Sequence, residues 1–157
     1  MQTALNLAIE PSPSTSVPGG ITFWAPGIPQ PGGSKKAFYN PKAGRAYVVE
    51  DAKKNKPWRA TVQAFAMDAH QGKPLEGPLV VEVVMVMPRP AGHFGTKGVR
   101  PGAPRFPAVR PDASKLWRST EDALSGILWR DDSQIVDQHV RKIYGEKPGA
   151  LITVWPA

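Results

Sequence analysis

The chain has 157 residues, a formal net charge of +7 and an isoelectric point near 9.9. This length predicts one domain with a tail, and the charge favours a polyanionic partner, nucleic acid before membrane. The absence of cysteine excludes a disulfide scaffold, a thiolate zinc site and a cysteine nucleophile.

The sequence shows no membrane-spanning run and no signal peptide at its start. No run approaches the ~18 apolar residues of a membrane span, and the opening MQTALNLAIE lacks the basic and long apolar regions of a signal peptide. We therefore expect a cytoplasmic protein without a membrane partner. Residues 1–20 end in a Pro/Ser/Gly-rich stretch and predict a flexible tail, which leaves residues 21–157 as the folded domain.

The first half of this domain predicts a strand, a long loop and a helix. Residues 21–26 form a short apolar strand stopped by proline, and residues 27–45 form a Gly/Pro/Lys loop. Residues 46–50 are either a strand or the lead-in to a helix over 57–70, where a proline suits the first turn. The helix places apolar residues on one face, namely Trp58, Val62, Phe65, Ala66 and Ala69.

The second half predicts a central strand and a second helix. Residues 79–87 are almost continuously apolar, which is typical of a strand buried on both faces. Residues 89–111 are a loop rich in Pro, Gly and Arg. Residues 112–128 predict an amphipathic helix whose polar side carries Lys115, Arg118 and Asp122.

Two further strands complete the expected fold. Residues 133–145 predict a strand, and residues 150–156 predict a partner strand joined to it by the turn at 147–149. The order β–α–β–α–β–β indicates a small two-layer domain of the α/β or α+β class, with a mixed sheet and two main helices.

Positive charge gathers in two blocks, residues 32–60 and 89–118, each with a net charge of +6. Such blocks either hold DNA phosphates or are solvated loops. The loop around Lys35 and Lys36, with Phe38 and Tyr39 beside it, is either a DNA-contacting loop or a surface loop whose aromatic rings pack on the domain.

Three aspartates flank the second helix. Asp112 stands at its start, and Asp131 and Asp132 stand in the turn after it. Carboxylates set among cations suit metal-assisted phosphodiester hydrolysis; the alternative is a helix cap, turn residues and a surface ion pair between Arg118 and Asp122. The predicted helix separates its two ends by ~25 Å. The aspartates therefore meet only if the next strand returns along the helix or a second chain completes the site.

The motifs of residues 110–154 resemble the RusA family of Holliday junction resolvases. The family patterns stand here as Pro111-Asp112-Ala113-Ser114-Lys115-Leu116-Trp117-Arg118, Asp122-Ala123-Leu124-Ser125-Gly126, Asp131-Asp132-Ser133-Gln134-Ile135, Lys142-Ile143-Tyr144-Gly145 and Pro148-Gly149. Further similarity lies in Pro26-Gly27, Pro31, Pro74 to Pro78, Pro88-Arg89-Pro90 and His93-Phe94-Gly95, so that it covers about residues 21–155.

The resemblance implies a RusA-like fold and a homodimeric endodeoxyribonuclease that cuts four-way DNA junctions in recombination and repair with Mg²⁺ or Mn²⁺, in a bacterial or phage-infected cell. No small-molecule cofactor is implied. By position, the resemblance makes Asp112, Asp132 and Arg118 catalytic residues, with arginine where the family has lysine. The implied metal ligands are Asp112, Ser114, Asp131 and Asp132. We expect the DNA-binding residues to be Lys35, Lys36, Arg45, Arg110, Lys115 and Arg118.

One motif residue departs from the family. Ser114 stands where the family has a second aspartate, and a neutral hydroxyl is a poorer magnesium ligand than a carboxylate. Either a neighbour such as Glu121 or Asp122 substitutes, or cleavage is weak, or the chain binds branched DNA without cutting it. A generic RNA-binding module has little support, because no signature of the common RNA-binding folds is present.

Overall fold

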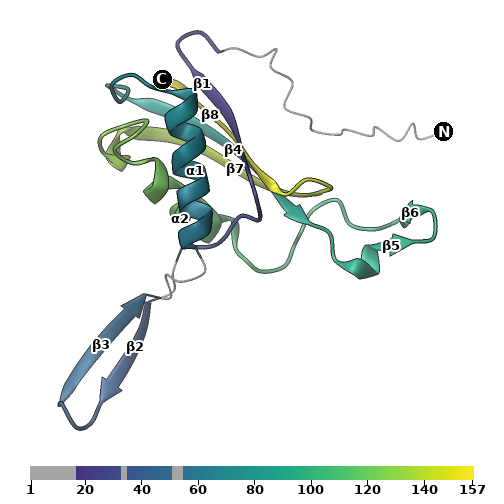
Figure 1. Ribbon diagram of the computed structural model, residues 1–157, viewed down its shortest axis with the longest axis horizontal. Coiled ribbons are helices and arrows are strands. Elements are labelled where there is room, and N and C mark those ends of the chain that lie inside the picture. The colour runs from purple at the N-terminus through teal and green to yellow at the C-terminus, as the bar shows by residue number, and fades with distance from the viewer. Residues whose placement is uncertain (1–16, 33–34, 51–54) are drawn as a thin grey trace.

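A mixed four-stranded sheet with two helices on one face forms the body of the protein (Figure 1). The computed structural model describes residues 17–32, 35–50 and 55–157, so residues 1–16 of the predicted tail lie outside the described residues. The body confirms the predicted small α/β domain of two layers. Neither helix in the described part of the chain is long and apolar enough to cross a membrane.

The sheet has the order β1-β8-β4-β7. Its strands are β1 (Ile21–Pro26), β4 (Leu79–Pro88), β7 (Ile135–Gly145) and β8 (Gly149–Pro156). β4 is central, as its apolar run predicted. It pairs parallel with β7 and antiparallel with β8.

The predicted hairpin between the last two strands is wrong. β8 pairs with β4 and with β1, and β4 lies between β7 and β8. Both faces of β4 are largely apolar, so its burial favours a position with a partner on each side. The short turn before β8 therefore passes over the end of β4 instead of closing a hairpin.

The helices lie side by side on the sheet. α1 (Lys56–Ala69) begins with proline in its first turn as predicted, and it buries Trp58, Val62 and Ala66. Phe65 is 41% exposed, so the predicted apolar face wrongly included this residue. Trp58 Nε1 donates a buried hydrogen bond of 3.2 Å to Thr120 Oγ1 and thereby links the two helices.

The second helix, α2 (Ala113–Leu124), ends four residues before the predicted boundary. Gly126 has a φ of +85°, which glycine adopts without steric cost, and its N–H donates to the carbonyl of Trp129. The chain therefore turns sharply after α2. Leu128, the last residue of the predicted helix, and Trp129 are fully buried in this turn.

The predicted loop over 27–45 contains a strand, and this prediction is wrong for its second half. β2 (Lys35–Asn40) and β3 (Arg45–Glu50) form an antiparallel hairpin that projects from the body (Figure 1). Asn40 Oδ1 accepts from the N–H of Lys42 at 3.0 Å, and Gly44 has a φ of +59°. The Asn-Pro-x-x-Gly turn thus closes the hairpin.

Residues 89–111 are mostly irregular, as predicted, and form a second projection (Figure 1). The segment contains a single 3-10 turn, η1 (Ala91–His93), and two strands of two residues each, β5 (Phe94–Gly95) and β6 (Gly98–Val99). It leaves the C-terminal end of β4 and returns to the N-terminal end of α2.

The sheet order makes a prediction at Gly149, the first residue of β8. A Cβ there would overlap the ring of Trp24 and would lie 2.6 Å from the carbonyl oxygen of Ala25. We expect Gly149→Ala to destabilise the fold by about 1–3 kcal/mol and to lower Tm by roughly 3–10 °C, measured by thermal denaturation. Gly92→Ala is the matched control, because nothing lies within 4 Å of that Cβ position. Equal Tm values for the two variants would contradict the observed register of β1 and β8.

Candidate active site

Helix α2 presents one polar face to solvent. Ser114, Arg118 and Asp122 are exposed on it, and Glu121 is partly buried beside them. The opposite face is buried in the core. Trp117 Nε1 donates a hydrogen bond of 2.8 Å to Gln138 Oε1 on β7, which fixes the rotation of the helix on the sheet.

At the N-terminal end of α2, Asp112 occupies the capping position. Its side chain makes no capping hydrogen bond, so the alternative role of a hydrogen-bonding cap is not fulfilled. Its Oδ2 atom instead lies 3.8 Å from Lys115 Nζ, and both side chains are exposed. Such a pair is weak in water, which leaves the carboxylate available to other partners. The carbonyl of Lys115 accepts from the N–H of Gly32 at 2.7 Å, so the chain leading to the β2–β3 hairpin contacts the helix here.

Beyond the C-terminal end of α2, a buried tryptophan orients Asp132. Trp129 is fully buried, and its Nε1 donates a hydrogen bond of 2.8 Å to Asp132 Oδ1. Asp132 itself is partly exposed. The indole therefore holds one carboxylate oxygen, and the carboxylate keeps further acceptor capacity.

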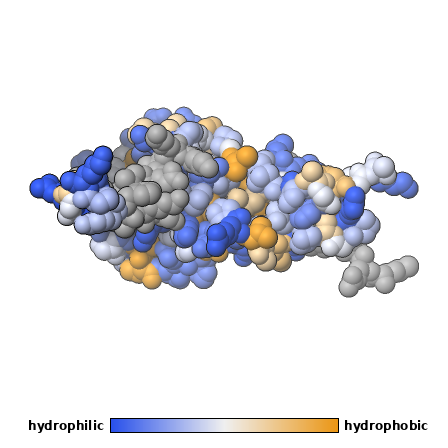
Figure 2. Space-filling view, turned by 90° about the horizontal axis from the view of Figure 1, so that it is seen from below, coloured by the Kyte–Doolittle hydropathy of each residue, from blue (hydrophilic) through white to orange (hydrophobic). Residues whose placement is uncertain are grey.

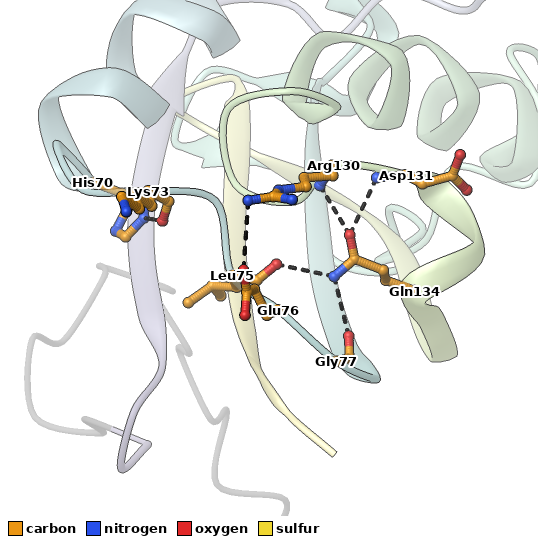
Figure 3. Close-up of polar contacts among 8 residues, drawn as sticks. All are labelled: His70, Lys73, Leu75, Glu76, Gly77, Arg130, Asp131 and Gln134. Atoms are coloured by element: carbon orange, nitrogen blue, oxygen red, sulfur yellow. Dashed lines mark hydrogen bonds and ion pairs between the residues drawn. The ribbon is translucent and has the colours of Figure 1, made fainter.

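Gln134 fixes the turn that carries the two aspartates (Figure 3). Its Oε1 accepts from the N–H groups of Arg130 and Asp131 at 2.9 and 3.1 Å. Its Nε2 donates to the carbonyls of Leu75 and Gly77 at 2.9 and 3.1 Å. The glutamine of the Asp-Asp-Ser-Gln motif thus connects this turn to the segment that enters β4. The amide oxygen and nitrogen of its side chain each make two hydrogen bonds.

Asp131 and Asp132 have different environments. Asp131 Oδ1 accepts from the N–H of Ser133 at 2.8 Å and caps the 3-10 turn η2 (Asp132–Gln134). Hydrogen bonding by Ser133 lowers the pKa of Asp131, because it favours the charged form. Asp131 therefore acts in the local structure of the turn, whereas Asp132 is the carboxylate aimed at α2.

Glu121, in the last turn of α2, is the carboxylate that sequence reasoning named only in passing. Burial raises its pKa first, and the negative charges of Asp132 and then Asp122 raise it further, while Arg118 lowers it. Glu121 and Asp132 are therefore close enough to repel each other. The available signal was the helical spacing, which sets Glu121 on the same face as Ser114 and Arg118.

The structure does not bring Asp112 and Asp132 together within one chain. α2 has 12 residues, so its ends are about 18 Å apart, with one aspartate at each end. The ion pair between Arg118 and Asp122, which was the alternative to a functional role, is also absent from the described residues. Among these residues, no group of three or more acidic or histidine side chains is placed to hold a metal ion.

The predicted DNA-binding residues come from three parts of the surface. Lys35 and Lys36 belong to β2 by their backbone, and their side chains lie outside the described residues. Arg45 begins β3 and is exposed, as is Arg110 ahead of α2. Lys115 and Arg118 are exposed on α2 itself.

The donor set at the C-terminal end of α2 fits a hard divalent cation. Glu121 and Asp132 supply two carboxylates whose mutual repulsion a cation would relieve. Mg²⁺ is typically held by one or two carboxylates together with phosphate and water. A basic domain with such carboxylates beside one end of a helix is suited to act on phosphodiesters.

Comparison with known proteins identifies the family. Residues 26–155 match the family described as "Endodeoxyribonuclease RusA", which covers nearly the whole chain. The chain is also similar to "Uncharacterized protein YqaN" of Bacillus subtilis (strain 168), with 30% identity over 98 residues, 59% of this chain and 69% of that protein. The chain therefore belongs to the RusA endodeoxyribonuclease family, and this membership supports a Holliday junction resolvase nuclease with branched DNA as its substrate.

The environment of Glu121 predicts a pH-dependent effect on stability. Its pKa in the folded protein is raised above the ordinary value of 4.5, so the ionised side chain costs stability once the pH rises through the raised pKa. We expect Glu121→Gln to raise Tm at pH 7 in metal-free buffer. This gain should shrink below pH 4.5, where the carboxyl of the parent chain is protonated.

The exposed Glu146→Gln is the control, and we expect no comparable gain from it. Thermal denaturation at several pH values measures both variants. A lower Tm for Glu121→Gln at pH 7 would show that the carboxylate stabilises the metal-free fold and would contradict the repulsion.

Proposed function

We propose that the protein is a homodimeric, divalent-metal-dependent endodeoxyribonuclease that resolves four-way DNA junctions in recombination and repair in the cytoplasm of a bacterial or phage-infected cell. The observation that carries this proposal is the family membership of residues 26–155, which supplies the reaction class. The carboxylates of Glu121 and Asp132 support it, because the charge of Asp132 raises the pKa of Glu121 while Arg118 lowers it.

Each side chain has a proposed role in hydrolysis of the phosphodiester. Asp132 and Glu121 hold Mg²⁺, or Mn²⁺ in its place, with Asp131 positioning the turn and adding negative charge nearby. A bound divalent ion lowers the pKa of water and neutralises charge on the phosphate. Arg118, which is always charged and has a planar fork of donors, binds the scissile phosphate and stabilises its developing charge.

A second copy of the chain completes the site in this proposal. Asp112 and Ser114 lie at the N-terminal end of α2, whose 12 residues span about 18 Å, and Asp132 follows its C-terminal end. A two-fold axis that sets two α2 helices antiparallel brings Asp112 and Ser114 of one copy to Glu121 and Asp132 of the other. Two equivalent sites result, as paired cuts in a symmetric junction require.

The basic residues around α2 hold the DNA arms in this arrangement. Lys115 and Arg118 on the helix, and Arg110 just before it, bind phosphates near the cut. Lys35, Lys36 and Arg45 extend the contact along the projecting β2–β3 hairpin. These contacts read the backbone and not the sequence, so they suit an enzyme that recognises DNA shape.

The shared site makes a prediction for mixed dimers. Neither Asp112→Asn nor Asp132→Asn alone should cut a labelled four-way junction in Mg²⁺. After unfolding and refolding together, half of the dimers carry one copy of each variant, and one of their two sites combines two unaltered aspartates. We therefore expect the mixture to nick the junction at about a quarter of the rate of the unmodified chain. The nicks should be single and not paired, because each active dimer has only one intact site.

Size-exclusion chromatography of the refolded mixture, with one copy carrying a tag, confirms that mixed dimers form. A control mixture of Asp132→Asn with Arg118→Ala should stay inactive, because the proposal assigns both residues of one copy to the same site. No nicking by the first mixture, despite mixed dimers, would show that Asp112 and Asp132 do not meet across two copies.

A second function, junction binding without cleavage, is favoured by Ser114, which places an exposed hydroxyl where the family has a carboxylate. Cleavage of an immobile four-way junction by the unmodified chain and by Ser114→Asp, with Mg²⁺, Mn²⁺ or EDTA, separates the two functions. We expect metal-dependent paired nicks from the unmodified chain and faster nicking by Ser114→Asp. Tight binding without nicks, with cutting restored by Ser114→Asp, would select the binding function.

A further inference from the structure

Residues 89–110, here called the arginine–aromatic segment, take no part in the proposed metal site. The segment forms the projection that carries β5 and β6 (Figure 1). It contains five basic residues and no acidic one. The basic residues are Arg89, Lys97, Arg100, Arg105 and Arg110. In the described part of the chain, none of them forms a salt bridge, so their charge is uncompensated.

Two of these arginines make hydrogen bonds to the backbone of the segment itself. Arg89 Nη1 donates to the carbonyl of Pro104 at 2.9 Å, and Arg100 Nε donates to the carbonyl of Phe94 at 2.9 Å. A carbonyl oxygen satisfies a donor but carries no net charge. The contacts therefore shape the segment and leave its positive field intact, which favours a polyanion as ligand.

The segment is anchored to the end of β7 by Tyr144 and Lys142. The N–H of Tyr144 donates to the carbonyl of Arg105 at 3.0 Å, and its ring contacts His93 edge-on at 5.0 Å and Arg89 at 5.3 Å. Lys142 Nζ donates to the carbonyls on either side of Arg110, each at 2.9 Å. A surface held in this way is ordered before a ligand binds, which lowers the entropic cost of binding.

Apolar side chains are exposed among these cations. Phe94 and Phe106 are 42% and 53% exposed, and Val99 and Val109 are also exposed. The guanidinium of Arg105 lies 5.4 Å from the ring centre of Phe106. Figure 2 shows apolar residues as small separate patches on a mostly hydrophilic surface, and not as the broad apolar face of an obligate protein interface.

We propose that the arginine–aromatic segment binds unpaired or unstacked bases of branched DNA, with its arginines on the adjacent phosphates. Exposed aromatic rings next to cations are the means by which proteins hold single-stranded DNA, because each base stacks on a ring. A regular duplex offers phosphates but keeps its bases stacked, so it engages only the cations. This inference rests on the proposed action on DNA junctions and assigns the segment the selection of branched over duplex DNA.

The test measures DNA binding in EDTA, so that cleavage plays no part. Fluorescence anisotropy compares the unmodified chain, Phe94→Ala/Phe106→Ala and Phe65→Ala on a four-way junction and on a duplex of the same sequence. The control Phe65 is 41% exposed on α1, outside the segment. We expect the double variant to lose about tenfold or more in junction affinity, with duplex affinity unchanged, and the control to match the unmodified chain.

Two further readouts complete the test. Lys97→Gln should weaken binding to both DNAs alike and reduce the salt slope of the affinity by about one. 2-Aminopurine at the branch point should lose fluorescence on binding the unmodified chain, through stacking, and lose less on binding the double variant. Sedimentation of the double variant checks its oligomeric state.

The outcomes separate this inference from the proposed function. An equal loss of affinity for junction and duplex, or no loss, overturns the inference, even where the unmodified chain still nicks junctions in Mg²⁺. A changed oligomeric state of the double variant also overturns it and assigns the rings to contacts between copies. Selective loss of junction affinity in a chain that never nicks supports the inference and refutes the endonuclease.

Discussion

The parallel pairing of β4 and β7 is the constraint on which the arrangement of functional residues depends. Two adjacent parallel strands require a crossover, and α2 is the helix of that crossover. α2 therefore runs opposite to both strands, and its two ends lie at opposite ends of the sheet. The motif residues before the helix and after it are separated by its length, which is the reason for proposing a site built from two copies.

The charged residues discussed above form two groups. One is a pair of carboxylates that repel each other, and the other is a set of arginines that face solvent. Glu121 and Asp132 repel each other, and the partial burial of Glu121 reduces the screening of this repulsion by water. A cation bound near them would therefore be attracted by both carboxylates. The arginines of residues 89–110 lie without acidic partners on a projection. DNA with a bound divalent ion complements both groups at once, because its phosphates neutralise the arginines and the ion neutralises the carboxylates.

The sequence predicted the features that follow from local patterns, and it missed those that depend on pairing. The apolar run of β4 and the helical spacing around Trp58 and Val62 were sufficient to place their elements. The partner of β8 was not predictable, because strand adjacency depends on which neighbour buries β4 best. Likewise, helical spacing set Glu121 on the polar face of α2 but did not indicate that it lies near Asp132, because that proximity depends on the sharp turn at Gly126.

Glu121 of a second copy could supply the carboxylate that Ser114 lacks. The two residues are seven positions apart on α2, about 10 Å along the axis, so one side chain does not replace the other within a single helix. When two α2 helices lie antiparallel across a two-fold axis, however, Ser114 of one copy faces the end of the other helix that carries Glu121. The carboxylate absent from one helix is then supplied by the other, and each shared site keeps three carboxylates, from Asp112, Glu121 and Asp132. In this proposal the dimer compensates for the departure from the family pattern, so the dimer and the chemistry are parts of one hypothesis.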